Sequence, residues 1–109
     1  MSRVLALMLA LLPAAVVAQQ DASPLAIAYR CDDGTRLQLE YARDRSGRAV
    51  ATSGSKRWTM TRQVAASGER YVDEKNGIEW WTKGRTGALT RLGSGKTVQC
   101  REQVPLKNK

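Results

Sequence analysis

From Leu25 onward, apolar and polar side chains alternate in short runs, and turn residues interrupt these runs about every ten positions. A period of two places successive side chains on opposite faces of an extended strand. Many short strands at this spacing are typical of an antiparallel sandwich or barrel. Because helical spacing is not found in residues 19–109, the pattern predicts an all-β domain.

Eight strands follow from the alternation. We expect them at 25–31, 37–41, 49–52, about 58–60, around 71, about 78–80, about 86–92 and about 96–101. In the first strand, Leu25, Ile27, Tyr29 and Cys31 share one parity, so they are expected to face the interior. Asn76-Gly77 predicts a tight type I′ hairpin turn, in which both central residues have positive φ.

The chain has two cysteines, Cys31 in the first predicted strand and Cys100 in the last. A disulfide between them would place these two strands side by side and close the sheet, which removes exposed strand edges. Closing a loop of this length stabilises a fold by about 4 kcal/mol on the chain-entropy model. The sequence therefore predicts a small eight-stranded antiparallel barrel closed by one disulfide.

Residues 1–18 have the features of a secretory signal peptide: a basic residue at Arg3, an apolar run over 4–12, and small residues up to Ala18. The mature chain is then 19–109, a single domain in which 102–109 is expected to be a loose tail. A lipid anchor would need a cysteine directly after the cleavage point, whereas the first cysteine is Cys31. We therefore expect a soluble periplasmic or secreted protein that is not lipid-anchored.

The composition argues against an enzyme. The sequence has no histidine, which removes the usual general base of hydrolases and the commonest ligand of a catalytic metal, so neither a metal nor a cofactor is expected. Residues 93–97 resemble the end of a phosphate-binding loop, but they join two strands and lack the earlier glycine. Asp32-Asp33 is interpreted as a pair of turn formers, not as a catalytic dyad.

The net charge of +8, or +7 once Arg3 leaves with the signal peptide, favours either solubility or a polyanionic partner. Aromatic and basic residues alternate near Trp58 and Trp80-Trp81, which is one way to build a nucleic-acid platform. Trp58 and Trp80 are better explained as core residues, so nucleic acid is not expected as a partner. A basic envelope module that binds an anionic polymer, such as lipopolysaccharide, stays open as an alternative function.

Two segments carry a resemblance to a known family: Ala-Ala-Ser-Gly-Glu-Arg-Tyr at 65–71 and Trp-Thr-Lys-Gly at 81–84. Together with the opening hairpin at 29–41 and Val-Gln-Cys at 98–100, they resemble the MliC/PliC family of bacterial membrane-bound and periplasmic inhibitors of c-type lysozyme. The family's fold is an eight-stranded antiparallel barrel. Two departures are visible: Ala65 replaces the first serine of the family pattern, and the segment between Tyr71 and Trp81 is about two residues longer.

The resemblance implies that this chain binds c-type lysozyme. In this interpretation, Ser67 and Gly68 enter the lysozyme cleft while Lys83 reaches the catalytic carboxylates. Tyr71 and Trp81 either support this loop or contact the partner. C-type lysozymes are usually basic, so the partners would attract one another only at short range. Whether the protein forms a homodimer is not decided by the sequence.

Overall fold

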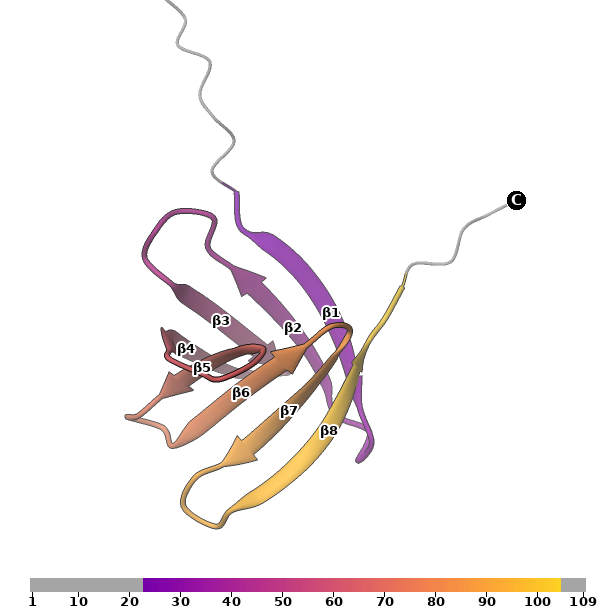
Figure 1. The fold of residues 1–109 in the computed structure, drawn as a ribbon. Helices are drawn as coiled ribbons and strands as arrows, with labels where there is room; N and C mark the ends of the chain where they lie inside the picture. The colour runs from indigo at the N-terminus through magenta and orange to yellow at the C-terminus, as the bar shows by residue number, and fades with distance from the viewer. Residues whose placement is uncertain (1–22, 105–109) are drawn as a thin grey trace, which may run out of the picture.

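The computed structural model describes residues 23–104 as a closed barrel of eight antiparallel strands (Figure 1). The strands are β1 (Leu25–Cys31), β2 (Arg36–Tyr41), β3 (Arg48–Ser53), β4 (Lys56–Gln63), β5 (Glu69–Asp73), β6 (Ile78–Lys83), β7 (Thr86–Arg91) and β8 (Lys96–Glu102). Each strand pairs with the next along the chain, and β8 pairs with β1. The predicted fold class and number of strands are confirmed. The predicted signal peptide lies outside the described residues.

The interior of the barrel is filled by every second side chain of the strands, as the alternation predicted. The buried residues that form this core are Tyr29, Cys31, Leu37, Leu39, Ala49, Ala51, Trp58, Met60, Tyr71, Ile78, Trp80, Leu89 and Cys100. Leu25 was predicted to face this interior but is exposed. The reason is that β8 pairs with β1 only from Tyr29 to Cys31, so the start of β1 extends past the closed part of the barrel.

Trp80 occupies the centre of the core and is completely buried. Its ring meets the ring of Tyr29 edge to face, at 4.8 Å between centroids, and its indole nitrogen donates a hydrogen bond of 2.8 Å to the hydroxyl of Tyr41. Space for so large a side chain comes from Gly87 on the neighbouring strand, where a Cβ would collide with the six-membered ring of Trp80. A glycine at the second position of β7 is therefore required by packing.

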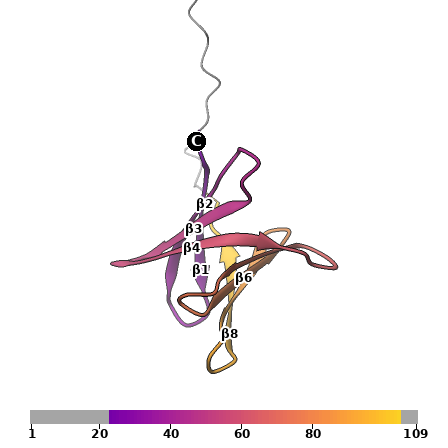
Figure 2. The ribbon, with the colours of Figure 1, turned by 90° about the vertical axis from the view of Figure 1, so that its left-hand side faces the viewer.

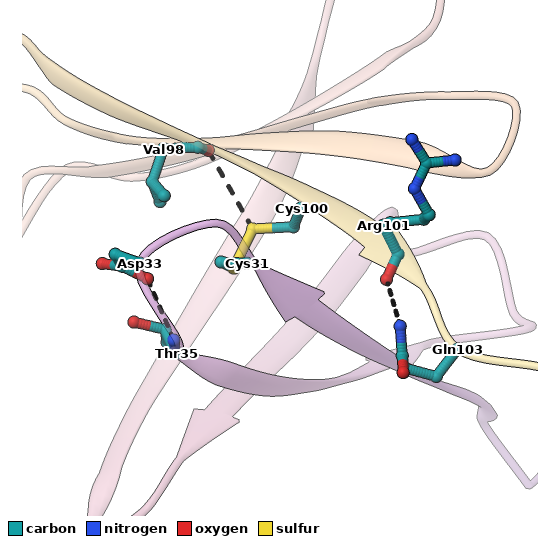
Figure 3. The surroundings of a disulfide bond; sticks show 7 residues. All are labelled: Cys31, Asp33, Thr35, Val98, Cys100, Arg101 and Gln103. Carbon is teal, nitrogen blue, oxygen red and sulfur yellow. Dashed lines mark hydrogen bonds between the residues drawn. A yellow bond between two sulfur atoms is a disulfide. The ribbon is translucent and has the colours of Figure 1, made fainter.

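The predicted disulfide joins Cys31 and Cys100, which lie directly opposite one another in the β1–β8 ladder (Figure 3). Beside it, the turn after β1 is held by a hydrogen bond of 2.9 Å from the backbone nitrogen of Thr35 to the carboxylate of Asp33. The bridge therefore covalently fastens the seam at which the first and last strands close the barrel.

Two local predictions were wrong. The β5–β6 turn is a four-residue loop over 74–77, and within the described residues only glycines have positive φ, so Asn76 does not take the type I′ conformation. The cause is Asp73, whose carboxylate accepts hydrogen bonds from the backbone and side-chain nitrogens of Asn76. In addition, residues 102 and 103, which were expected to begin a loose tail, are part of the barrel. Glu102 belongs to β8, and the backbone nitrogen of Gln103 donates a hydrogen bond of 2.8 Å to the carbonyl oxygen of Ala28.

The up-and-down topology gives the barrel two distinct ends. One, which we name the corner end, carries the β2–β3 loop, the β4–β5 loop over 64–68 and the β6–β7 turn at Gly84-Arg85. The other, which we name the disulfide end, carries the remaining four turns and the Cys31–Cys100 bridge. Figure 2 shows the β4–β5 loop projecting at the right and the β7–β8 turn at the bottom.

Candidate functional site

The residues at 67–68 and 81–83, predicted from the sequence to act together, lie side by side at the corner end. Glu69, the first residue of β5, pairs with Thr82 in the β5–β6 ladder. Gly68 and Ser67 directly precede it, so this register brings them to the end of β6, next to Lys83. The sheet therefore unites two segments that are more than ten residues apart in the sequence.

Alternation along β6 decides which of its side chains face outward. Thr82 is buried in the barrel wall, so Trp81 and Lys83 on either side of it point away from the interior. Lys83 is exposed, and the ion pairs found within residues 23–104, which are Arg62–Glu69, Arg70–Glu79 and Arg85–Glu102, do not involve it. The ammonium group is thus placed on the surface, and no carboxylate in the described part of the chain forms an ion pair with it.

Gly68 sets the shape of the corner. Its φ of 70° lies in the left-handed region, which other residues adopt only at a cost. A Cβ at this position would collide with the carbonyl oxygen of Thr82 and would lie 3.1 Å from the indole nitrogen of Trp81. Both the conformation and the close approach to β6 therefore require glycine.

Trp81 holds the corner against the sheet. Its indole nitrogen donates a hydrogen bond of 2.9 Å to the carbonyl oxygen of Ser67. The guanidinium of Arg70 lies 6.0 Å from the centroid of the Trp81 ring, and its Nε is 2.6 Å from a carboxylate oxygen of Glu79. Ser67, Trp81 and Lys83 also line one shallow surface hollow of about 340 Å³. These contacts hold the Ser67 peptide in place and leave its side chain at the surface.

Tyr71, the fifth predicted contact residue, is placed inside the barrel. It is 5% exposed, its ring lies 5.5 Å from that of Tyr41, and its hydroxyl donates a hydrogen bond of 3.2 Å to Glu69. Burial, and then the negative charge of Glu69, raise the pKa of Tyr71 above its ordinary value. Of the two roles considered for this residue, the geometry matches support of the loop.

The sequence analysis missed Val64, whose side chain is 94% exposed in the β4–β5 loop. The residue has the same parity as the buried Trp58 and Met60, so the alternation alone gives it an inward position. It points out because the packed interior along β4 ends at Met60, and Arg62, which has the same parity, is already exposed. An apolar residue between the end of a strand and the Ser-Gly turn is the only signal that the sequence offers.

Other kinds of site find little support at residues 23–104. That part of the chain holds no cluster of three or more side chains suited to bind a metal ion, and no helix long and apolar enough to cross a membrane. The corner offers an exposed ammonium, a hydroxyl and a rigid backbone, which are groups that can bind a partner.

Comparison with known proteins identifies the family of the chain. A family model described as membrane-bound lysozyme-inhibitor of c-type lysozyme, MliC, matches residues 29–97, a segment that contains the whole corner. The chain belongs to the MliC family. The Ser67–Lys83 arrangement is thus part of an MliC domain, as the resemblance had implied, although the matched segment ends before Cys100.

The chain is similar to one relative in sequence and to one solved structure in fold. It is 37% identical over 68 residues to the membrane-bound lysozyme inhibitor of C-type lysozyme from Cupriavidus necator, covering 62% of this chain and 53% of that protein. The chain thus spans about half the length of this curated MliC relative. The fold is similar to that of Pseudomonas aeruginosa MliC, solved in complex with hen egg white lysozyme, with a TM-score of 0.55 and 23% identity over 88% of this chain and all of that one.

Proposed function

We propose that this protein is an inhibitor of c-type lysozyme that acts by binding the enzyme and has no catalytic activity of its own. Membership of the MliC family supports the proposal, as does a relative named for lysozyme inhibition. The observation that carries it is the position of Lys83, an exposed ammonium with no ion-pair partner within residues 23–104, beside the rigid Ser67-Gly68 corner.

The proposed mechanism follows from the chemistry of the target. A retaining glycosidase needs one protonated carboxyl group and one ionised carboxylate, about 5 Å apart. A lysine ammonium is a compact charge with three donors on a long stem, so it can enter a narrow cleft and bond to both groups. Its charge would lower the pKa of the catalytic acid and remove the proton that the leaving group needs. Lys83 would therefore inhibit electrostatically while the corner excludes the substrate.

The other residues of the corner have distinct parts in this mechanism. Ser67 offers its hydroxyl to the cleft, Gly68 allows the tight conformation, and Trp81 holds the Ser67 carbonyl. Tyr71 supports the base of the loop from inside the barrel through Glu69. We add Val64 to the proposed contact surface, because an apolar side chain that is 94% exposed next to the corner gains free energy when a partner covers it.

The decisive experiment measures whether the purified protein stops hen egg white lysozyme from clearing a suspension of bacterial walls. Lys83→Ala should weaken binding by about 2 to 5 kcal/mol, as expected when one member of a desolvated charge pair is removed. Lys75→Ala removes an equal charge from the exposed β5–β6 loop at the disulfide end and should leave the inhibition constant unchanged. Equal inhibition by the Lys83→Ala variant and the unmodified protein would refute the mechanism.

The charge of the protein gives a second test. With a net charge of +7 after loss of the signal peptide, the inhibitor has no long-range attraction to a basic lysozyme. The association rate should therefore rise or stay constant as salt is added. A steep fall in that rate would show that the natural target is acidic.

We also propose that residues 1–18 are removed on export and that the remaining domain works as a soluble, unanchored protein. Both cysteines are joined in the disulfide, which supports the absence of a lipidated thiol. Mass spectrometry of the exported protein should show an N-terminus at Gln19 and no added lipid mass.

A further inference from the structure

The disulfide end of the barrel contains a group of basic side chains that the proposed lysozyme inhibition does not use. Each of them lies two residues from an interior residue on its own strand, at the last inward-facing position before the turn. The pairs are Lys56 with Trp58, Arg91 with Leu89, and Lys96 with Val98. Because side chains two apart share a face of a strand, these three cations stand at the rim of the barrel interior, a set that we name the cationic rim.

The cationic rim surrounds a pocket of about 510 Å³ in the mouth of the barrel. Trp58 and Leu89 contribute apolar surface deeper in the pocket, and Ser53 and Thr35 contribute polar groups to its wall. Mouths of β-barrels are frequent ligand sites, and this volume lies in the range that small-molecule sites occupy. The pocket therefore has room for a group of the size of a substituted sugar.

The charges of the cationic rim are not balanced by ion pairs. Arg91 and Lys96 are directly opposite in the β7–β8 ladder, an arrangement in which like charges repel. The ion pairs found in the described part of the chain involve none of the three cations. One acid, Asp33, lines the pocket, and its carboxylate accepts a hydrogen bond from the backbone of Thr35. The wall therefore carries a net charge of +2.

Arg91 is partly positioned before any ligand arrives. Its guanidinium lies 5.9 Å from the centroid of the Trp58 ring, which favours a cation above the ring face. The pKa of Asp33 is lowered mainly by its hydrogen bonds with Thr35 and, to a smaller extent, by the charge of Arg91. Asp33 and the Trp58 ring therefore both lie within range of the guanidinium, at the mouth of the pocket.

We propose that the cationic rim binds a phosphate group carried on a sugar. Phosphate suits a planar guanidinium that can donate two parallel hydrogen bonds, together with two ammonium groups, and its charge would relieve the repulsion between Arg91 and Lys96. The apolar surface beneath the rim suits the carbon-bound hydrogens of a sugar ring. The site lies at the opposite end of the barrel from Lys83, so it can be filled while the corner holds its partner.

The test uses glucose 1-phosphate as the soluble probe, with inorganic phosphate and glucose for comparison. The three tryptophans give three indole N–H signals in an NMR titration. The signal of Trp58 should shift with the sugar phosphate, whereas that of Trp81 at the corner end should not. The double variant Arg91→Gln with Lys96→Gln should bind about tenfold more weakly or worse, since charge-assisted hydrogen bonds are lost.

A matched control separates a specific site from general attraction. Arg43→Gln with Arg45→Gln removes the same charge from the exposed β2–β3 loop at the corner end and should change the affinity less than twofold. Equal weakening in both double variants would overturn the proposal, and so would the absence of binding both to the soluble probes and to the lipid vesicles described below. Lysozyme inhibition by the Arg91→Gln, Lys96→Gln variant should stay unchanged, so the two proposals fail independently.

The same phosphate chemistry occurs in free saccharides and in the headgroups of glycolipids. Phosphatidylcholine vesicles that carry a phosphorylated glucosamine lipid distinguish these sources. Binding of the soluble probe that depends on Arg91 and Lys96 assigns a free saccharide. Binding that has the same dependence but occurs only on the vesicles assigns a headgroup, and failure of both arms refutes the site.

Discussion

Gly68 gives the sharpest test of how the corner is built, because the barrel supplies a matched control. Gly68 and Gly54 have nearly the same backbone conformation, with φ values of 70° and 62°. A Cβ at Gly54 would meet nothing within 4 Å, whereas a Cβ at Gly68 would collide with the Thr82 carbonyl oxygen and touch the Trp81 indole. Replacing each glycine by alanine therefore separates the cost of the conformation from the cost of the close contact.

The magnitudes follow from these contacts. Each alanine should cost about 1 to 2 kcal/mol for its left-handed conformation. At Gly68 the collision adds about 1 to 3 kcal/mol of overpacking, and displacement of the corner breaks the hydrogen bond between Trp81 and Ser67, which contributes about 1 kcal/mol. We expect Gly54→Ala to lower the free energy of unfolding by about 1 to 2 kcal/mol, and Gly68→Ala to lower it by about 3 to 6 kcal/mol.

Urea unfolding, followed by tryptophan fluorescence, measures the two stabilities, and the wall-clearing assay measures inhibition at a temperature at which both variants are folded. Gly68→Ala should weaken inhibition at least tenfold, a change of about 1.4 kcal/mol, because Ser67 moves relative to Lys83. Gly54→Ala, at the disulfide end, should inhibit normally. If both variants lose the same stability and keep the same inhibition, the tight contact between the corner and β6 is not what shapes the site.

Three further predictions concern the barrel itself. Replacing both Cys31 and Cys100 by serine should lower the free energy of unfolding by about 4 kcal/mol, because the bridge closes a segment of 69 residues, and an unchanged denaturation midpoint would contradict the role of the seam. Gly87→Ala should destabilise the fold by about 1 to 3 kcal/mol or more because the new methyl group overpacks the Trp80 ring, whereas Gly93→Ala, with open space around it, serves as its control. Burial raises the pKa values of Tyr29, Tyr41 and Tyr71 above the ordinary value of 10.0, so the folded state keeps these phenols neutral. The contribution of these three groups to the free energy of unfolding is complete below pH 10.0 and is lost as the pH rises further. Unfolding free energies measured across this range should therefore fall as the pH rises, and a flat profile would contradict the burial of these hydroxyls.

The sequence predicted the fold well because the alternation of apolar and polar residues shows which side chains fill the interior of a small barrel. Parity alone placed Tyr29, Leu39, Met60 and Trp80 in the interior. The failures occurred where a single polar contact or a strand end decides the geometry. The carboxylate of Asp73 holds Asn76 and makes the turn a four-residue loop, which the Asn-Gly pair does not reveal.

The candidate site was predicted from motif order, and the structure adds the reason that its residues meet, which is the pairing of Glu69 with Thr82. Two features were beyond the sequence pattern. Val64 is exposed because the packed interior along β4 already ends at Met60. The cationic rim depends on which strand ends face one another across the barrel, and the period of a single strand does not contain that information.

The hydrogen bond from Trp81 to the Ser67 carbonyl means that the residues that hold the corner in place differ from those at its tip. The pairing of β5 with β6 fixes where the corner returns to the barrel. The small apolar residues at 64–66 form the tip of the corner and are not needed for this pairing. Substitutions at 64–66 should therefore change the surface of the corner and leave the barrel unchanged.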